Sequence, residues 1–208
     1  MKLVTNTITL TALALSLTVG TSATQAVTTP TELVKPLISY TSLKDAKDDV
    51  KAVYTEIKAA FGIVPEPIKG LSLNPSMLRN TWEMYKLMGN NQNFLPKTTT
   101  MMRYLVAEAN HCEYCVGFNK GMMLNIFKMS EDEINALQRD PNTAKLDEKQ
   151  KSMLLFMLKS TSHPTDVMQS DIDALKKLGW SETDIMEGVK QATEMVATSL
   201  FIDTFKIQ

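Results

Sequence analysis

EANHCEYCVGFN, residues 108–119, contains both cysteines of the chain and one of its two histidines. In a thioredoxin-like protein, a Cys-x-x-Cys pair follows a strand within a βαβ unit. The residues before this pair instead place apolar side chains at helical spacing, at Met101, Tyr104 and Leu105. The sequence therefore excludes a thioredoxin fold and predicts a Cys-x-x-Cys pair on helical flanks.

The rest of the chain also predicts helices. Residues 45–62 repeat apolar side chains at intervals of three and four, and Gly62 stands where a helix cap belongs. Asn74 followed by Pro75 predicts a second helix start, and Pro164 predicts a helix end. Further starts are predicted at Ser130, at about Asp147, at Ser170 and at Ser181, and a last helix from Ile185 to about Phe205. No run of β-branched residues shows the period-two alternation that is typical of a strand. The predicted fold class is therefore all-α, a helical bundle.

The N-terminus reads as an export signal. Lys2 is followed by an uncharged apolar run, ITLTALALSLTV, which is shorter than the roughly 20 residues of a membrane span. Small residues then place cleavage after Ala26 or Ala23. We expect a signal peptide over residues 1–26, an extended arm over 27–44 and one helical domain over 45–208, with the mature protein periplasmic or secreted. The opposing interpretation is a buried or anchoring N-terminal helix.

Charge and composition limit the partners. The formal net charge is −1 at pH 7, so no basic field points to nucleic acid or to an anionic lipid surface. The mature chain contains no predicted membrane span. We therefore expect small molecules or proteins as partners.

The residues around the cysteines exclude several functions of a Cys-x-x-Cys pair. Attachment of a c-type heme needs histidine directly after the second cysteine, where this chain has Val116. Zinc needs four ligands, and His111 and His163 do not form a second pair, which leaves only a site shared between subunits. No cofactor or metal is therefore expected. A bridge across so short a loop adds little stability, so a redox pair is favoured over a structural staple.

The motif also suggests how such a pair is supported. If one helix runs through it, four side chains share a face: Glu108, Cys112, Cys115 and Asn119. The carboxylate could then transfer a proton, and the amide could donate to a thiolate, although each also fits a solvated or capping role. His111 could lower a thiol pKa when charged, or be a surface residue. A helix that began at Cys112 would instead place its dipole on that thiol.

The order of the motifs resembles a known family. FGIVPEPIKGLSLNPSMLRNTWEMYKLM, EANHCEYCVGFN, LDEKQKSMLLFMLKSTSHP and a Gly-Trp-Ser-Glu pair follow one another as in the carboxymuconolactone decarboxylase family, in its AhpD-like, peroxidase-related branch. The resemblance covers residues 43–205. It implies a helical bundle that forms homo-oligomers, trimers or hexamers. It also implies an alkylhydroperoxidase with Cys115 as attacking thiol, Cys112 as resolving thiol, a hydroperoxide or disulfide substrate and a dithiol reductant.

The chain departs from that family at its proton relay. The family has a glutamate twelve residues before the first cysteine and a histidine four residues after the second, where this chain has Thr100 and Asn119. Neither side chain titrates near neutral pH. Glu108 or His111 could substitute by position. The leading hypothesis is a thiol-dependent peroxidase or disulfide oxidoreductase; the alternatives are a non-catalytic oligomeric binding protein with a structural disulfide and, with less support, a cofactor-free decarboxylase.

Overall fold

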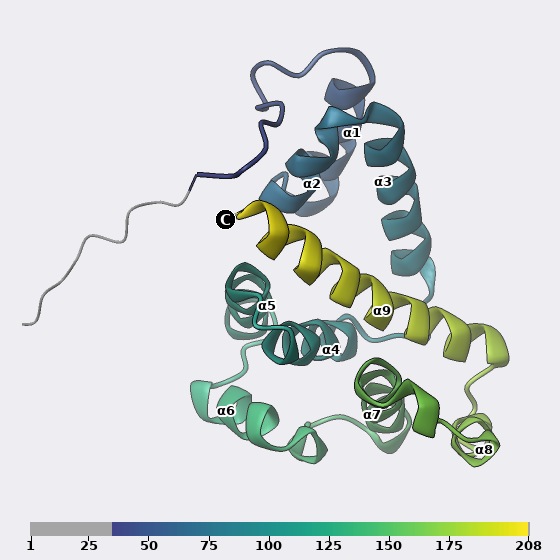
Figure 1. Ribbon diagram of the computed structural model, residues 1–208. Helices are drawn as coiled ribbons and strands as arrows, with labels where there is room; N and C mark the ends of the chain where they lie inside the picture. The colour runs from purple at the N-terminus through teal and green to yellow at the C-terminus, as the bar shows by residue number, and fades with distance from the viewer. Residues whose placement is uncertain (1–34, 208) are drawn as a thin grey trace, which may run out of the picture. The chain divides into compact units, whose positions relative to one another are not determined.

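The computed structural model describes residues 35–207 of the chain (Figure 1). The predicted signal peptide and residues 27–34 of the predicted arm lie outside the described residues. Over the described range the chain forms nine α-helices and three short 3-10 helices, and it forms no strand. The predicted all-α fold is therefore confirmed. No helix in this range has both the length and the apolar character that crossing a membrane requires.

The first three helices pack around an apolar cluster of their own. They are α1 (Asp48–Phe61), α2 (Glu66–Gly70) and α3 (Pro75–Asn90). The cluster contains Val53, Tyr54, Ile57, Ile68, Leu78 and Trp82. Two predicted helix boundaries are confirmed. Gly62 ends α1 with a φ of 77°, and the side chain of Asn74 caps the start of α3 by accepting a hydrogen bond from the Met77 N–H. Residues 35–47, ahead of α1, contain no helix.

The other helices surround a second, larger core. They are α4 (Pro96–Ala109), α5 (Glu113–Asn125), α6 (Glu131–Arg139), α7 (Glu148–Ser162), α8 (Gln169–Lys177) and α9 (Glu182–Phe205). The long helix α9 packs against α4 and α7, as Figure 1 shows. Flexible methionine side chains fill much of this core, and the buried ones include Met101, Met102, Met123, Met153 and Met157. Both cysteines belong to the same core.

Most of the predicted helix starts in this part are confirmed. Ser130 and Ser181 each form a capping box with the acidic residue three places later, and the Asp147 side chain caps α7. The predicted start at Ser170 is wrong. Helix α8 begins at Gln169 because the carboxylate of Asp171 accepts a hydrogen bond of 2.8 Å from the N–H of Met168, one residue before the helix.

A polar clasp fixes the loop between α3 and α4. The side-chain amides of Asn91 and Asn93 donate to the same carboxylate oxygen of Asp184, at 2.8 and 3.0 Å. The Gln150 amide donates to the carbonyl oxygen of Asn93 at 2.7 Å. Asp184 lies in α9 and Gln150 in α7, so the clasp holds the start of α4 against both helices.

Candidate functional site

The helix before the cysteines ends inside the motif. The N–H of Cys112 donates to the carbonyl oxygen of Ala107, and the N–H of His111 donates to that of Glu108, each at 3.1 Å. His111 has a φ of 58°, the left-handed conformation. These features form a Schellman cap, which is more often closed by glycine. The expectation of one helical face from Glu108 to Asn119 is therefore wrong, because α4 ends at Ala109 and α5 begins at Glu113.

The two cysteines lie at the start of α5. Cys112 is the N-cap residue and Cys115 is in the first turn, and a disulfide joins them with their Cα atoms 5.3 Å apart. Both are buried, with 0% and 3% of their surfaces exposed. The positive end of a helix dipole favours the thiolate over the thiol at such positions. Of the two arrangements that the sequence left open, the structure has the helix beginning at Cys112.

A serine from a distant part of the chain contacts Cys115. The hydroxyl of Ser199, in α9, lies 3.9 Å from the Cys115 sulfur and 2.9 Å from the carbonyl oxygen of Met195. Ser199 is 0% exposed, so water does not compete for these contacts. Because the hydroxyl carries one proton, it donates either to the carbonyl or to the sulfur.

An arginine links the two positions where the family's relay residues are replaced. The Nε of Arg103 donates to the side-chain oxygen of Asn119 at 3.3 Å, and its Nη2 donates to the hydroxyl oxygen of Thr100 at 3.1 Å. The amide nitrogen of Asn119 donates to the carbonyl oxygen of Cys115 at 2.8 Å. Thr100 and Asn119 are buried. A chain of hydrogen bonds therefore runs from Thr100 through Arg103 and Asn119 to the backbone of Cys115.

Among the residues that the structure describes, no carboxylate pairs with the charge of Arg103. No salt bridge reaches this side chain within residues 35–207, whereas Arg79 on α3 has several. Removal from water lowers the pKa of Arg103 to about 10, and the nearby hydroxyl of Tyr85 opposes that shift. The guanidinium is still protonated at neutral pH. It is thus a partly buried positive charge beside the first turns of α5.

The two proposed relay substitutes lie elsewhere. The Glu108 carboxylate faces the hydroxyl of Tyr104, and burial together with this carboxylate raises the pKa of that phenol. His111 is exposed in the cap between the helices. No side-chain hydrogen bond joins Glu108 or His111 to either cysteine in the part of the chain that the structure describes. Of the five predicted site residues, the structure brings together Cys112, Cys115 and Asn119.

Sequence reasoning missed two residues of this site. Arg103 stands three residues after Thr100, so both lie on one face of α4, and that spacing could have revealed it. Ser199 is 84 residues from Cys115, and no local pattern announces such a contact.

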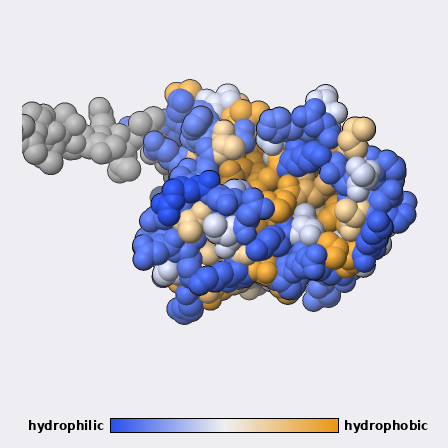
Figure 2. All heavy atoms as spheres, turned by 90° about the horizontal axis from the view of Figure 1, so that it is seen from below, coloured by the Kyte–Doolittle hydropathy of each residue, from blue (hydrophilic) through white to orange (hydrophobic). Residues whose placement is uncertain are grey.

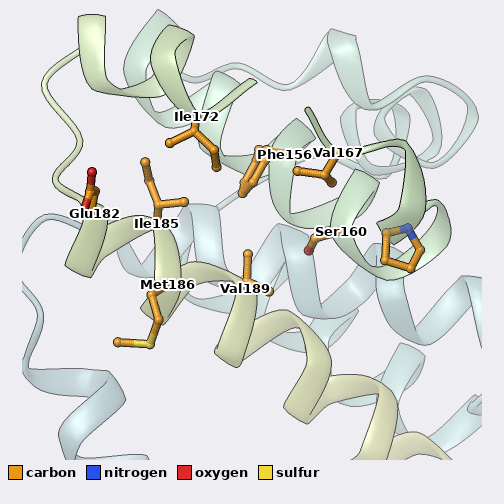
Figure 3. A pocket seen from close by; sticks show the side chains of 9 residues that line it. Phe156, Ser160, Val167, Ile172, Glu182, Ile185, Met186 and Val189 are labelled. Atoms are coloured by element: carbon orange, nitrogen blue, oxygen red, sulfur yellow. The ribbon is translucent and has the colours of Figure 1, made fainter. Parts of the chain in front are cut away.

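A separate hollow lies away from the cysteines. It measures about 460 Å³ and is bordered by Phe156, Ser160, Pro164, Val167, Ile172, Glu182, Ile185, Met186 and Val189. These residues come from α7, α8 and α9 and the connection after α7. Figure 3 shows the side chains of Phe156, Ile172 and Ile185 pointing toward one another across it. Figure 2 shows apolar side chains gathered on the face that carries α6, α7 and α8, with hydrophilic ones around them.

Fold and site together define an all-α protein with a buried Cys-x-x-Cys disulfide at the N-terminus of a helix. No protein-family model and no curated protein sequence matches the chain. Solved structures do match. An AhpD core, peroxidase-related protein from Ralstonia eutropha JMP134 superposes with a TM-score of 0.70 at 21% identity, over 83% of this chain and 91% of that one.

Two further structures agree with this match. A peroxidase-related protein from Silicibacter sp. TM1040 has a TM-score of 0.70 at 20% identity, over 88% of this chain and 94% of that one. The debrominase Bmp8 in complex with 2,3,4-tribromopyrrole has a TM-score of 0.68 at 14% identity, over 85% and 93%. The chain therefore has the AhpD-like fold, as the resemblance of its motifs implied.

Proposed function

We propose that the protein is a thiol-dependent peroxidase that uses Cys115 to attack a hydroperoxide and Cys112 to resolve the product. The observation that carries this proposal is the pairing of Cys112 and Cys115 at a helix N-terminus. There the Ser199 hydroxyl contacts the Cys115 sulfur, and the Asn119 amide donates to the Cys115 carbonyl oxygen. The AhpD-like fold of the peroxidase-related neighbours supports it.

The reaction balances in three steps. The Cys115 thiolate attacks the terminal peroxide oxygen of ROOH, the O–O bond breaks, and sulfenic acid forms while RO⁻ takes a proton and leaves as ROH. The Cys112 thiolate then attacks the sulfur of Cys115, which gives the disulfide and water. A dithiol reductant restores both thiols by exchange and is itself oxidised to a disulfide. The sum is ROOH plus a dithiol giving ROH, water and a disulfide.

In this proposal the thiolate forms without a relay base. Thr100 and Asn119 cannot accept a proton near neutral pH. The dipole of α5 stabilises negative charge on both cysteines, and the Ser199 hydroxyl can turn from the Met195 carbonyl toward a Cys115 thiolate. The site would therefore hold a thiolate that is present before the peroxide arrives.

A thiol count tests this function. The full-length protein is reduced with a dithiol, treated with an alkyl hydroperoxide and assayed for free thiols, beside Cys115→Ser and Cys112→Ser. Loss of both thiols per peroxide, recovery on reduction and abolition by Cys115→Ser are expected, and Cys112→Ser should stop at the sulfenic acid. The proposal would be contradicted by a disulfide that resists strong reductant, or by thiols that react with the hydroperoxide no faster than free cysteine does.

The hollow between α7, α8 and α9 favours a second function, binding of an apolar small molecule. Its volume of about 460 Å³ is within the range of ligand pockets, and its lining is mostly aliphatic and aromatic. Titration with an apolar fluorescent probe tests it. Val189→Trp fills the hollow and should abolish probe binding while leaving thiol chemistry intact. Equal probe binding by both proteins would reject this site.

Export and self-association complete the proposal. Export rests on the apolar run at residues 8–19, and N-terminal sequencing of protein recovered outside the cytoplasm would test it. A homo-oligomer is supported by the family resemblance and by exposed apolar side chains at two places, Phe118 on α5 at 39% and Ile126 just after the end of α5 at 62%. Light scattering gives its mass, and a monomer at micromolar concentration would exclude it.

A further inference from the structure

Arg103 occupies a costly position for a positive charge. It is partly buried, no carboxylate compensates it within the described chain, and its two hydrogen bonds go to the neutral groups of Thr100 and Asn119. A charge removed from water normally has a partner of opposite sign. The described residues of the oxidised site offer no such partner. Reduction, however, can create an anion one helical turn from Asn119, on the sulfur of Cys115.

We propose that Arg103 is the positioning residue of the site, which acts through Asn119 to stabilise the Cys115 thiolate in place of a relay base. The inference rests on the proposed peroxidase function. Asn119 receives a hydrogen bond from Arg103 on one side and donates to the Cys115 carbonyl on the other. The guanidinium is thus tied to the turn of α5 that carries the reacting sulfur.

Thr100 fixes the other end of this arrangement. Its hydroxyl donates to the carbonyl oxygen of Pro96 at 2.8 Å, so its oxygen is free to accept from Arg103 at 3.1 Å. Both residues at the replaced relay positions therefore hold the arginine. A glutamate and a histidine would move a proton between them, whereas a threonine and an asparagine can hold a fixed cation. In this site a permanent positive charge on Arg103 would take the place of the family's proton transfer.

Other charged and titratable groups around this region oppose or accompany the effect. Tyr85 of α3 lies near Arg103 and near Glu194 of α9. Burial raises the pKa of the Tyr85 phenol, the Glu194 carboxylate raises it further, and the Arg103 guanidinium lowers it. Glu108 of α4 and Glu113 of α5 are the carboxylates nearest in sequence to Cys112. Carboxylates raise the pKa of a neighbouring thiol and a guanidinium lowers it. Removing Arg103 should therefore take away a charge that favours the Cys115 thiolate, while the dipole of α5 and the Ser199 hydroxyl still act on it.

The pKa of the Cys115 thiol tests this role directly. It is measured from the thiolate absorbance against pH in the full-length Cys112→Ser protein, which leaves Cys115 as the one cysteine. A unit charge about 10 Å away at an effective dielectric constant of about 20 shifts a pKa by about one unit. Arg103→Gln should raise the thiol pKa by about that amount, and Arg103→Lys, which keeps the charge, should reverse most of the rise.

Two further variants complete the design. Arg139→Gln, at the exposed end of α6, removes the same charge elsewhere and should leave the thiol pKa unchanged. Asn119→Ala keeps the charge but cuts its link to α5, and should also raise the thiol pKa. If circular dichroism shows that Arg103→Gln does not fold, Asn119→Ala decides the question. A thiol pKa equal to that of the parent in the folded variants overturns the role of Arg103.

The results that would reject the role of Arg103 differ from those that would reject the proposed peroxidase function. Failure of the wild-type protein to consume peroxide rejects the peroxidase, while the pKa of the single thiol is still measurable. Normal peroxide turnover with an unshifted thiol pKa in Arg103→Gln rejects only the positioning role.

Discussion

The hydroxyl oxygen of Ser199 lies 3.9 Å from the sulfur of Cys115, although α9 and α5 are far apart in the sequence. In the oxidised protein the hydroxyl proton also has the Met195 carbonyl oxygen within 2.9 Å. A thiolate is a stronger acceptor than a disulfide sulfur, so reduction should turn this proton toward Cys115.

Replacing Ser199 with alanine should therefore weaken the Cys115 thiolate. One hydrogen bond contributes about 1 kcal/mol, so we expect the rate of Cys115 alkylation at neutral pH to fall about fivefold. Ser160→Ala is the matched control, because Ser160 is also buried and also donates to a backbone carbonyl, in α7. Equal alkylation rates in the two variants would show that the Ser199 contact does not act on the thiolate.

Glu108→Gln and His111→Asn test the two proposed substitutes for the relay. Neither side chain is hydrogen-bonded to a cysteine in the described structure, so each should keep peroxide turnover within about twofold of wild type. Asparagine suits position 111 because it tolerates a positive φ. Steady-state peroxide consumption is the measurement. A loss of about a hundredfold in either variant would instead identify a general base.

Reduction of the disulfide should leave the protein folded. The bridge joins residues only three apart, and closing so short a loop is worth about 2 kcal/mol. We expect urea unfolding of wild-type protein with and without a dithiol, and of Cys112→Ser, to differ by no more than about this amount. Unfolding on reduction would make the bridge a structural staple and remove the redox cycle.

Local signals explain how much of the fold the sequence could predict. Gly62, Asn74 and Ser181 mark helix ends because a cap depends on residues within one turn. The break at His111 has no such mark, since a non-glycine residue takes the left-handed position. The Ser199 contact could not be predicted because it depends on how α9 packs against α5, which no spacing within one helix encodes.

The cap at His111 leads to a stability prediction. A left-handed conformation costs a residue with a Cβ atom about 1 kcal/mol, and glycine avoids that cost. His111→Gly should therefore raise the free energy of unfolding by about 1 kcal/mol in urea denaturation. Ala109→Gly, in the last turn of α4, should lower it by a similar amount. A decrease in His111→Gly would mean that the imidazole makes a stabilising contact.

Asp184 should give the protein part of its sensitivity to acid. Burial alone would raise the pKa of this carboxyl, but hydrogen bonds from Asn93 and Ser181 outweigh it and hold the pKa below its ordinary value. A lowered folded-state pKa adds stability that is complete above the unfolded pKa of about 4 and is lost as the pH falls toward the folded value. Asp184→Asn should lower the free energy of unfolding by about 2 kcal/mol at neutral pH, and by less below about pH 4. Urea unfolding across this pH range measures the effect, with the exposed Asp166→Asn as control. A constant gap between wild type and Asp184→Asn at every pH would mean that the clasp depends on the shape of the side chain and not on its charge.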